Sequence, residues 1–166
     1  MSVLLSDDLV TGFVAHLNLE LTAHQAYSAL ANYCSLPSVS YPGFAKLFRR
    51  EADEEWTHAR KFMDYIIRRG NNFPMPAIKE VDIEDRTDMI KLLETAMELE
   101  LEVLASMNNL HSECDGANDV DAAVFLDDFI REQTEAIAEL DSKITIVRRL
   151  SSDVHGLYHY DRDLLE

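Results

Sequence analysis

The apolar residues of this chain recur every three or four positions over four long stretches, and no other feature of the sequence constrains the fold as strongly. Only five glycines and four prolines are present, and most of them lie between these stretches or near their ends. The periodicity therefore predicts an all-α chain. The expected helices cover about residues 7–33, 42–69, 83–114, 119–150 and 155–165.

Local signals mark the ends of these helices. Ser6 precedes two acidic residues in the manner of a helix N-cap, and Pro42 suits a first helical turn. Gly70 is a stop signal for the second helix, and Asp119 can cap the fourth. We therefore expect separate long helices rather than one continuous rod.

The four long helices have matched lengths of about 28 residues, or roughly 42 Å at 1.5 Å per residue. Two tight turns between such helices predict a four-helix bundle. The middle connection, residues 71–82, could stretch to roughly 40 Å at about 3.3 Å per residue. That reach favours a crossover that makes helices two and three parallel, although a slack loop between antiparallel helices also fits. We expect residues 1–166 to form a single domain.

The composition limits the partners of such a chain. Of 166 residues, 31 are acidic and 15 are basic, which gives a formal net charge of −16. Nucleic acid and anionic membrane surfaces would repel this charge, so we expect neither as a partner. The charge suits a cationic partner such as a metal ion, although a solvated acidic surface is its commoner cause.

Cysteine content and hydropathy bear on the compartment. Cys34 and Cys114 are too few for a disulfide framework or a zinc site. No apolar run reaches the length of a membrane-spanning helix. We therefore expect a soluble chain in the reducing cytoplasm, or in an organelle after removal of a targeting peptide.

Polar residues interrupt each apolar stripe. They are Glu20 in the first helix, Glu55 and His58 in the second, Glu100 in the third and Gln133 in the fourth. A buried carboxylate is costly unless it is paired or binds a metal ion, and the stripes carry no lysine or arginine to pair with these. The pattern therefore favours a metal site in the core.

The heights of these residues along the bundle agree. In an antiparallel hairpin, residues equidistant from the turn lie level with each other. Glu20 and Glu55 are equidistant from the Pro37 turn, and Glu100 and Gln133 are equidistant from the Gly116 turn. Two independent hairpins thus place their polar residues at one level.

Carboxylate oxygens with a single imidazole suit iron, manganese or zinc. Glu55 and His58 are three residues apart, so both can reach one site. The ligands could hold two divalent ions, and two ferrous ions side by side can deliver two electrons to oxygen. Tyr27 lies on the Glu20 stripe, where it would hydrogen-bond the site, donate an electron, or simply pack in the core.

Three segments resemble the signature segments of ferritins, namely residues 18–23 (NLELTA), 53–59 (DEEWTHA) and 132–137 (EQTEAI). Residues 44–48 and 156–158 resemble the animal heavy-chain subunits of this family. The resemblance covers nearly the whole chain. It implies the ferritin-like four-helix bundle with a long crossover between helices two and three and a short fifth helix.

The resemblance also implies a ferroxidase centre. Glu20, Glu55 and His58 would bind one iron ion, and Glu55 would bridge to a second ion held by Glu100 with the help of Gln133. Ferritins form hollow cages of 24 subunits that store ferric mineral. We therefore expect a homo-oligomeric cage that takes Fe(II) and O2 and binds no haem.

The chain departs from the animal ferritins at two sites. Thr57 and Arg60 replace carboxylates that nucleate mineral in animal subunits. Glu54, Glu132 and Glu135 instead resemble three ligands of the third iron site of bacterial ferritins, whose fourth ligand position is Ala136 here. A solvated acidic face would explain these three glutamates equally well.

The residues of the animal three-fold channel also differ. Its acidic positions align with Ala123 and Leu126. Asp119, Asp121 or Asp127 would replace them, or iron would enter elsewhere.

Two other functions fit parts of the pattern. A di-iron oxidase or peroxidase of small oligomeric state usually repeats Glu-x-x-His on a second helix, whereas this chain has Gln133 and Ala136 there. The same missing second Glu-x-x-His argues against bacterioferritin, and Trp56 stands where bacterioferritin would have its haem-binding methionine. A mainly structural, light-chain-like cage subunit would not be expected to keep every ligand of the centre.

Overall fold

The chain is helical, as the apolar periodicity predicts. The computed structural model describes residues 3–83 and 88–166, and this part of the chain forms five α-helices and no strand. In order, they are α1 (Asp7–Ser35), α2 (Pro42–Arg68), α3 (Met89–Gly116), α4 (Val120–Leu150) and α5 (Val154–Asp163). No helix in this part of the chain is both long and apolar enough to cross a membrane.

The expected signals are found at the helix ends. The Ser6 hydroxyl accepts a hydrogen bond from the backbone N–H of Leu9 at 3.3 Å, and Pro42 opens α2. Gly70 follows α2 with φ of +83°, a conformation that glycine adopts without strain. The Asp119 carboxylate caps α4 by accepting from the third residue of that helix at 3.1 Å.

The start of α3 differs from the prediction. We expected the helix from residue 83, but Ile83 is not helical and α3 begins at Met89. Residues 84–87 of that expected helix lie outside the described residues. The Asp88 carboxylate accepts the backbone N–H of Lys91 at 2.9 Å and so supplies the N-cap. Ile83 is buried as an apolar residue of the connection, which explains why the periodicity included it in the helix.

The other helix ends lie within two residues of the expected ones. Helix α1 extends to Ser35 instead of residue 33, and α2 ends at Arg68 instead of residue 69. Helix α3 ends two residues later than expected, α4 begins one residue later, and α5 covers Val154–Asp163 instead of 155–165. Differences of this size are usual because helix ends fray.

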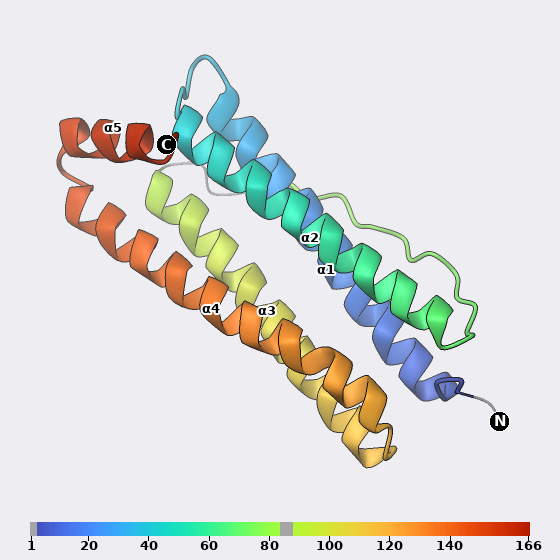
Figure 1. Ribbon diagram of the computed structural model, residues 1–166. Coiled ribbons are helices and arrows are strands. Elements are labelled where there is room, and N and C mark those ends of the chain that lie inside the picture. Colours follow the sequence, from blue (N-terminus) through green and yellow to red (C-terminus); the bar gives the residue numbers. More distant parts are fainter. Residues whose placement is uncertain (1–2, 84–87) are drawn as a thin grey trace.

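The four long helices form two antiparallel hairpins, α1 with α2 and α3 with α4, which meet through α1 and α3 (Figure 1). The connection after α2 runs back along the bundle to the end where α3 begins, so α2 and α3 are parallel (Figure 1). The crossover prediction is therefore confirmed. Helix α5 lies across one end of the bundle, against the start of α2.

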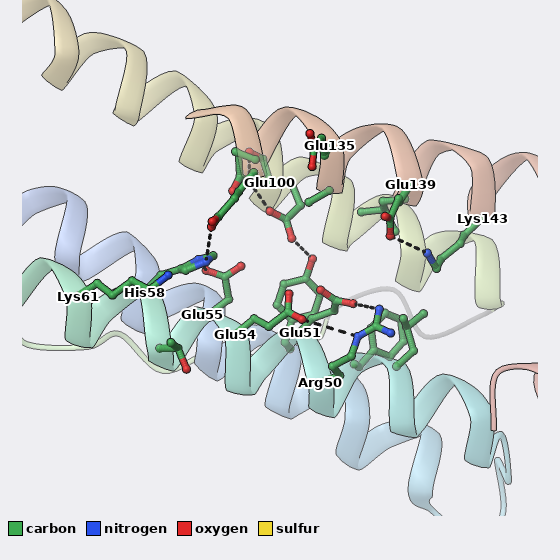
Figure 2. Close-up of a pocket in the computed structure, with 18 residues that line it drawn as sticks. Arg50, Glu51, Glu54, Glu55, His58, Lys61, Glu100, Glu135, Glu139 and Lys143 are labelled. Atoms are coloured by element: carbon green, nitrogen blue, oxygen red, sulfur yellow. Dashed lines mark hydrogen bonds and ion pairs between the residues drawn. The ribbon is translucent and has the colours of Figure 1, made fainter. Parts of the chain in front are cut away.

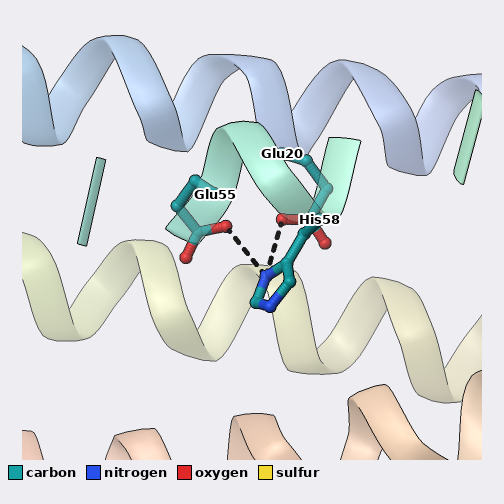
Figure 3. Close-up of side chains that lie close together, drawn as sticks. All are labelled: Glu20, Glu55 and His58. Carbon is teal, nitrogen blue, oxygen red and sulfur yellow. Dashed lines mark ion pairs between the residues drawn. The ribbon is translucent and has the colours of Figure 1, made fainter. Parts of the chain in front are cut away.

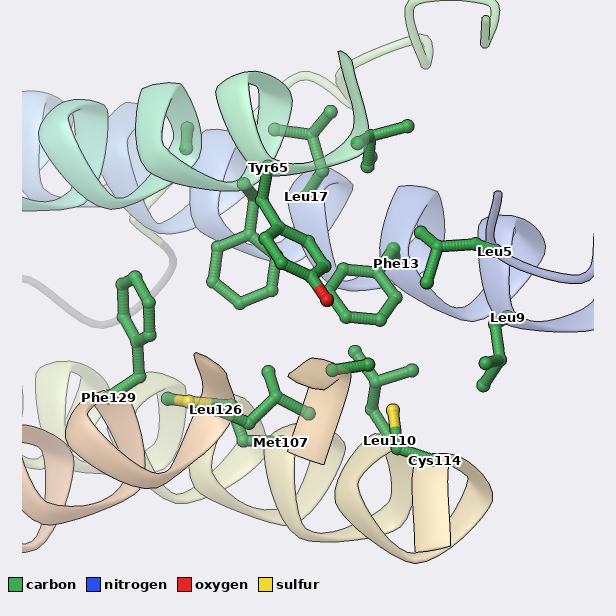
Figure 4. Packing of buried hydrophobic residues seen from close by; sticks show 14 of the residues in the cluster. Leu5, Leu9, Phe13, Leu17, Tyr65, Met107, Leu110, Cys114, Leu126 and Phe129 are labelled. Carbon is green, nitrogen blue, oxygen red and sulfur yellow. The ribbon is translucent and has the colours of Figure 1, made fainter. Parts of the chain in front are cut away.

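The inner faces of the helices form two apolar clusters along the bundle. The first contains Phe13, Leu17, Tyr65, Met107 and Phe129 among others (Figure 4), and the second includes Phe44, Phe48, Leu93 and Ile144. Both cysteines are buried as free thiols, one in each cluster. Along their helices, the buried Glu55, Glu100 and Gln133 lie between residues of the first cluster and residues of the second.

Two apolar stripes with three- and four-residue steps pass through Glu100 on α3, and only one of them is buried. Ala96 and Val103 are buried beside Glu100, whereas Met97 and Leu104 of the other stripe are only half-buried. Glu100 itself keeps its inward position because it lies on the line shared by both stripes.

Candidate metal centre

Three of the polar core residues, one from α1 and two from α2, converge on one point on the side of these helices that faces α3 (Figure 3). Glu20, Glu55 and His58 each offer a ligand atom, and these atoms all lie within 4.8 Å of one another (Figure 3). His58 Nδ1 is 3.6 Å from Glu55 Oε2 and 3.9 Å from Glu20 Oε2. Among residues 3–83 and 88–166, no other three histidine, cysteine or acidic residues form such a group.

These three atoms have no hydrogen-bond partner of their own. Glu20 Oε2, Glu55 Oε2 and His58 Nδ1 are buried and without a hydrogen bond in the described part of the chain. Buried polar atoms are almost always paired, and an unpaired one costs about 1–3 kcal/mol. Three such atoms facing one another fit a divalent cation, which would satisfy all of them together.

A second carboxylate site lies beside the first. The Tyr27 hydroxyl and the Gln133 amide each donate a hydrogen bond to one oxygen of Glu100. The same amide lies 3.1 Å from the Glu100 backbone oxygen. Each carboxylate oxygen has a further lone pair, so Glu100 can still bind a cation while it is held by these donors.

Burial makes the carboxylates of this centre hard to ionise without a cation. It raises the pKa of Glu55 to about 8, and it also raises the pKa of Glu20. Burial, together with the charge of Glu55, raises the pKa of Glu100 to about 7. Burial alone would lower the pKa of His58, but contact with Glu55 and the charge of Glu20 raise it overall.

Burial also affects the neighbouring hydroxyl group. It raises the pKa of Tyr27 well above the usual value, so this hydroxyl keeps its proton and acts as a donor to Glu100. The centre therefore combines acidic groups that would gain from a positive charge with donors that hold them in place.

A pocket of about 520 Å³ opens from this centre to the outside between α2 and α4 (Figure 2). Its volume is many times that of a water molecule, so a hydrated ion can enter it. Five further glutamates line the pocket, namely Glu51, Glu54, Glu132, Glu135 and Glu139. Three cationic side chains, Arg50, Lys61 and Lys143, lie among them, and the excess of acidic groups favours the entry of cations.

The three glutamates expected at a third iron site lie along this pocket but do not form a tight group. Glu54 is 3.9 Å from Arg50, and Glu132 is 3.6 Å from His58 Nε2. Their side chains are more than half exposed. The carboxylate oxygens of Glu54, Glu132 and Glu135 do not all lie within 4.8 Å of one another, as the ligand atoms of Glu20, Glu55 and His58 do. The third site therefore stays a prediction.

All three aspartates considered for the three-fold channel contact basic side chains of this chain. Asp119 and Asp121 contact Arg69 at 2.7 and 3.4 Å and so tie the end of α2 to the start of α4. Asp127 instead lies 3.1 Å from His111.

One buried histidine, His16, was not predicted from the sequence pattern. His16 is fully buried, and its Nε2 lies 2.8 Å from Glu20 Oε1 while its Nδ1 lies 2.9 Å from the Ser106 hydroxyl. Burial lowers the pKa of His16 to about 4. The available signal was its position four residues before Glu20, which places the two on one helix face.

The fold and the donor set define a four-helix bundle protein with a buried group of carboxylate and histidine side chains that could hold a metal ion. The model of the ferritin-like domain matches residues 12–150. The chain belongs to the ferritin family.

Individual relatives agree with this assignment. The chain is 33% identical to the soma ferritin of Lymnaea stagnalis over 155 residues, which are 93% of this chain and 88% of that protein. It is 32% identical to a chloroplastic ferritin of Malus baccata var. xiaojinensis and to chloroplastic ferritin-2 of Zea mays. The matched parts are 97% and 96% of this chain and 66% of each plant protein.

Proposed function

We propose that this chain is a subunit of an iron-storage protein that oxidises Fe(II) with O2 at a two-iron centre and keeps the ferric product inside a cage. The observation that carries the proposal is the group of unpaired, buried ligand atoms of Glu20, Glu55 and His58. Membership of the ferritin family supports the same function.

The residues would divide between two ions. Glu20, Glu55 and His58 bind the first ion, and Glu100, supported by Tyr27 and Gln133, binds the second. Glu55 would be shared by both ions, as the resemblance to ferritins implies, because it belongs to the first group and its charge also acts on Glu100.

Two ferrous ions give up one electron each, and O2 takes up both electrons with two protons to form hydrogen peroxide. The protein binds the ions side by side and releases protons from its carboxyl groups as they bind, because burial keeps Glu55 protonated near neutral pH. The acidic pocket between α2 and α4 then leads both ions and protons to and from the centre.

The test is rapid mixing of the metal-free protein with Fe(II) in aerated buffer. His58→Ala and Glu55→Gln should each slow the fast absorbance change at least about a hundredfold, since each removes a ligand (one hundredfold is about 2.7 kcal/mol). His24→Ala is the matched control, because His24 contacts the backbone oxygen of Ala52 outside the ligand group and should leave the rate unchanged. A fast phase that persists in both ligand variants would reject the proposal.

Assembly is tested separately by size. Large apolar side chains are exposed on the single chain, including Ile67, Val120 and Val154 at 62%, 71% and 80%, and such surfaces are usual at subunit contacts. A cage of 24 chains of 18.9 kDa each would elute at roughly 450 kDa. Elution as a small oligomer with fast oxidation would instead indicate a di-iron oxidase or peroxidase. A cage without fast oxidation would indicate a structural subunit.

We propose a cytoplasmic location for the chain. An organelle is the alternative, because the two plant relatives described above are named as chloroplastic. Fractionation of source cells, followed by antibody detection of the chain, distinguishes the cytoplasm from an organelle.

A further inference from the structure

The Glu20 carboxylate has two different surroundings. Its Oε1 receives a contact from His16 Nε2 at 2.8 Å, whereas its Oε2 has no hydrogen bond and faces His58 at 3.9 Å. One oxygen is therefore anchored to the protein, and the other is presented to the candidate metal site.

His16 lies behind Glu20 and outside the ligand group. The atoms within 4.8 Å of one another belong to Glu20, Glu55 and His58, and His16 is not among them although it is fully buried. The His16 ring packs against the ring of Phe62, with the ring centroids 4.6 Å apart. Its place is thus fixed by packing as well as by hydrogen bonds.

The contacts of His16 form a chain from α3 to the centre. A neutral imidazole has one N–H and one acceptor nitrogen, and an ionised carboxylate can only accept. When Glu20 is ionised, His16 must therefore donate from Nε2, which leaves Nδ1 to accept from the Ser106 hydroxyl at 2.9 Å. The ionised Glu20 thus sets the tautomer of His16, and the Ser106 hydroxyl on α3, which can donate or accept, pairs with the remaining ring nitrogen.

We propose that His16 is a positioning residue that holds Glu20 as a one-oxygen ligand of the first metal ion, with Ser106 holding the other ring nitrogen of His16 in place. Without this anchor, both oxygens of Glu20 would be free to rotate or to bind the ion together. The inference rests on the proposed function, because it assigns a role relative to the same metal site.

The test uses Co(II) as the probe, titrated under anaerobic conditions, with affinity and visible absorption spectrum as readouts. His16→Leu removes the donor and should weaken binding about 10- to 100-fold, the usual effect of losing a group that orients a metal ligand. It should also change the Co(II) absorption bands, because Glu20 changes its mode of binding. His16→Gln restores an N–H donor one helical turn from Glu20 and should recover most of the affinity.

The control is His24→Leu, which makes the same change one helical turn on the other side of Glu20, where His24 contacts the Ala52 backbone oxygen and not a ligand, and it should leave affinity and spectrum as in the wild type. If His16→Leu matches the wild type in both readouts, the positioning role is wrong and the proposed function is unaffected. Wild-type protein that neither binds Co(II) in its core nor oxidises Fe(II) rapidly would instead reject the proposed function.

Ser106→Ala keeps the inference testable if His16→Leu does not fold. Ser106 is only half-buried, so its hydroxyl can be removed with little effect on packing. The variant should show the same spectral change as His16→Leu with a smaller loss of affinity. Binding and spectrum identical to the wild type in Ser106→Ala would overturn the proposal.

Discussion

Glu100 differs from the other carboxylates of the centre because both of its oxygens already accept hydrogen bonds, from Tyr27 and Gln133. These donors stabilise the ionised form in a place where burial raises the pKa of Glu100 to about 7. The Tyr27 hydroxyl thus donates to Glu100, a contact that a tyrosine buried only by packing would lack.

Replacement of this hydroxyl gives a direct prediction. Tyr27→Phe keeps the ring and removes the donor, so we expect the second Fe(II) ion to bind about tenfold more weakly, since one hydrogen bond to a charged group contributes about 1.5 kcal/mol or more. Anaerobic calorimetric titration with Fe(II) measures this. Tyr158→Phe, at an exposed position of α5, is the control and should have no effect. Unchanged binding in Tyr27→Phe would reduce Tyr27 to a packing residue.

The glutamates of the pocket require a comparison of two variants. Glu132 contacts Nε2 of His58 at 3.6 Å, so Glu132→Gln should disturb the orientation of a first-ion ligand and slow oxidation of the first irons as well as later ones. Glu135 makes no such contact with His58, so Glu135→Gln should slow only the oxidation of later Fe(II) ions if the third site exists. Stopped-flow traces at two and at many Fe(II) per subunit separate these phases. An equal loss in all phases of Glu135→Gln would contradict the third site.

Residues of the centre could be found in the sequence because a polar residue in a helical apolar stripe is conspicuous. Glu20, Glu55, Glu100 and Gln133 are all buried, as their spacing predicts. His16 could not be found in the same way, because its neighbour Leu17 continues the stripe and a single histidine near a helix face is common. Its contact with Ser106 depends on how α1 packs against α3, which the spacing within one helix does not specify.

At the level of helices, the docking of α5 depends on a glycine. The backbone N–H of Phe44, in the first turn of α2, donates to the Asp161 carboxylate of α5 at 2.9 Å. A Cβ atom on Gly43 would lie only 1.7 Å from the Asp161 backbone oxygen. The close approach of α5 to α2 therefore requires glycine at position 43.

Gly43→Ala should push α5 away from α2 and break the Asp161 cap. We expect a loss of about 1–3 kcal/mol of stability, the usual cost of overpacking. Gly116→Ala is the matched control, since a Cβ there would meet no atom within 4 Å, and it should leave stability unchanged or slightly higher. Thermal unfolding of both variants measures the difference. Equal stability of the two would show that α5 does not depend on this contact.

The predicted helix ends agree with the structure where a single residue determines the end. Pro42, Gly70 and Asp119 each act through their own backbone or side chain, and the helices begin or end beside them. The start of α3 was misplaced because Ile83 continues the apolar period, while burial in a connection satisfies an apolar side chain as well as burial in a helix. Apolar periodicity shows which residues are buried but does not fix the helix boundary, which the N-cap at Asp88 determines.

At the scale of the whole molecule, the buried carboxyl groups make stability depend on pH. The folded-state pKa values of Glu55 and Glu100, about 8 and about 7, lie above the usual 4.5. At a pH between the usual pKa of 4.5 and the folded-state pKa of each group, the unfolded chain has released a proton that the folded chain still holds. The stability of the metal-free fold therefore falls as the pH rises from about 5 to 8. A divalent ion binds the ionised form, so the stabilisation that it gives grows over the same range.

The unfolding temperatures of the metal-free and the Zn(II)-loaded protein should therefore diverge as the pH rises from about 5 to 8, with calorimetry as the measurement. The double variant Glu55→Gln with Glu100→Gln is the control, because its amides neither titrate nor bind the ion strongly. It should lose the pH-dependent gap between the two states. The net charge of −16 also disfavours the fold as acidic groups ionise, but that contribution is shared by variant and wild type. A gap that widens equally in the variant would mean that Zn(II) acts on surface charge and that the core carboxylates are not its ligands.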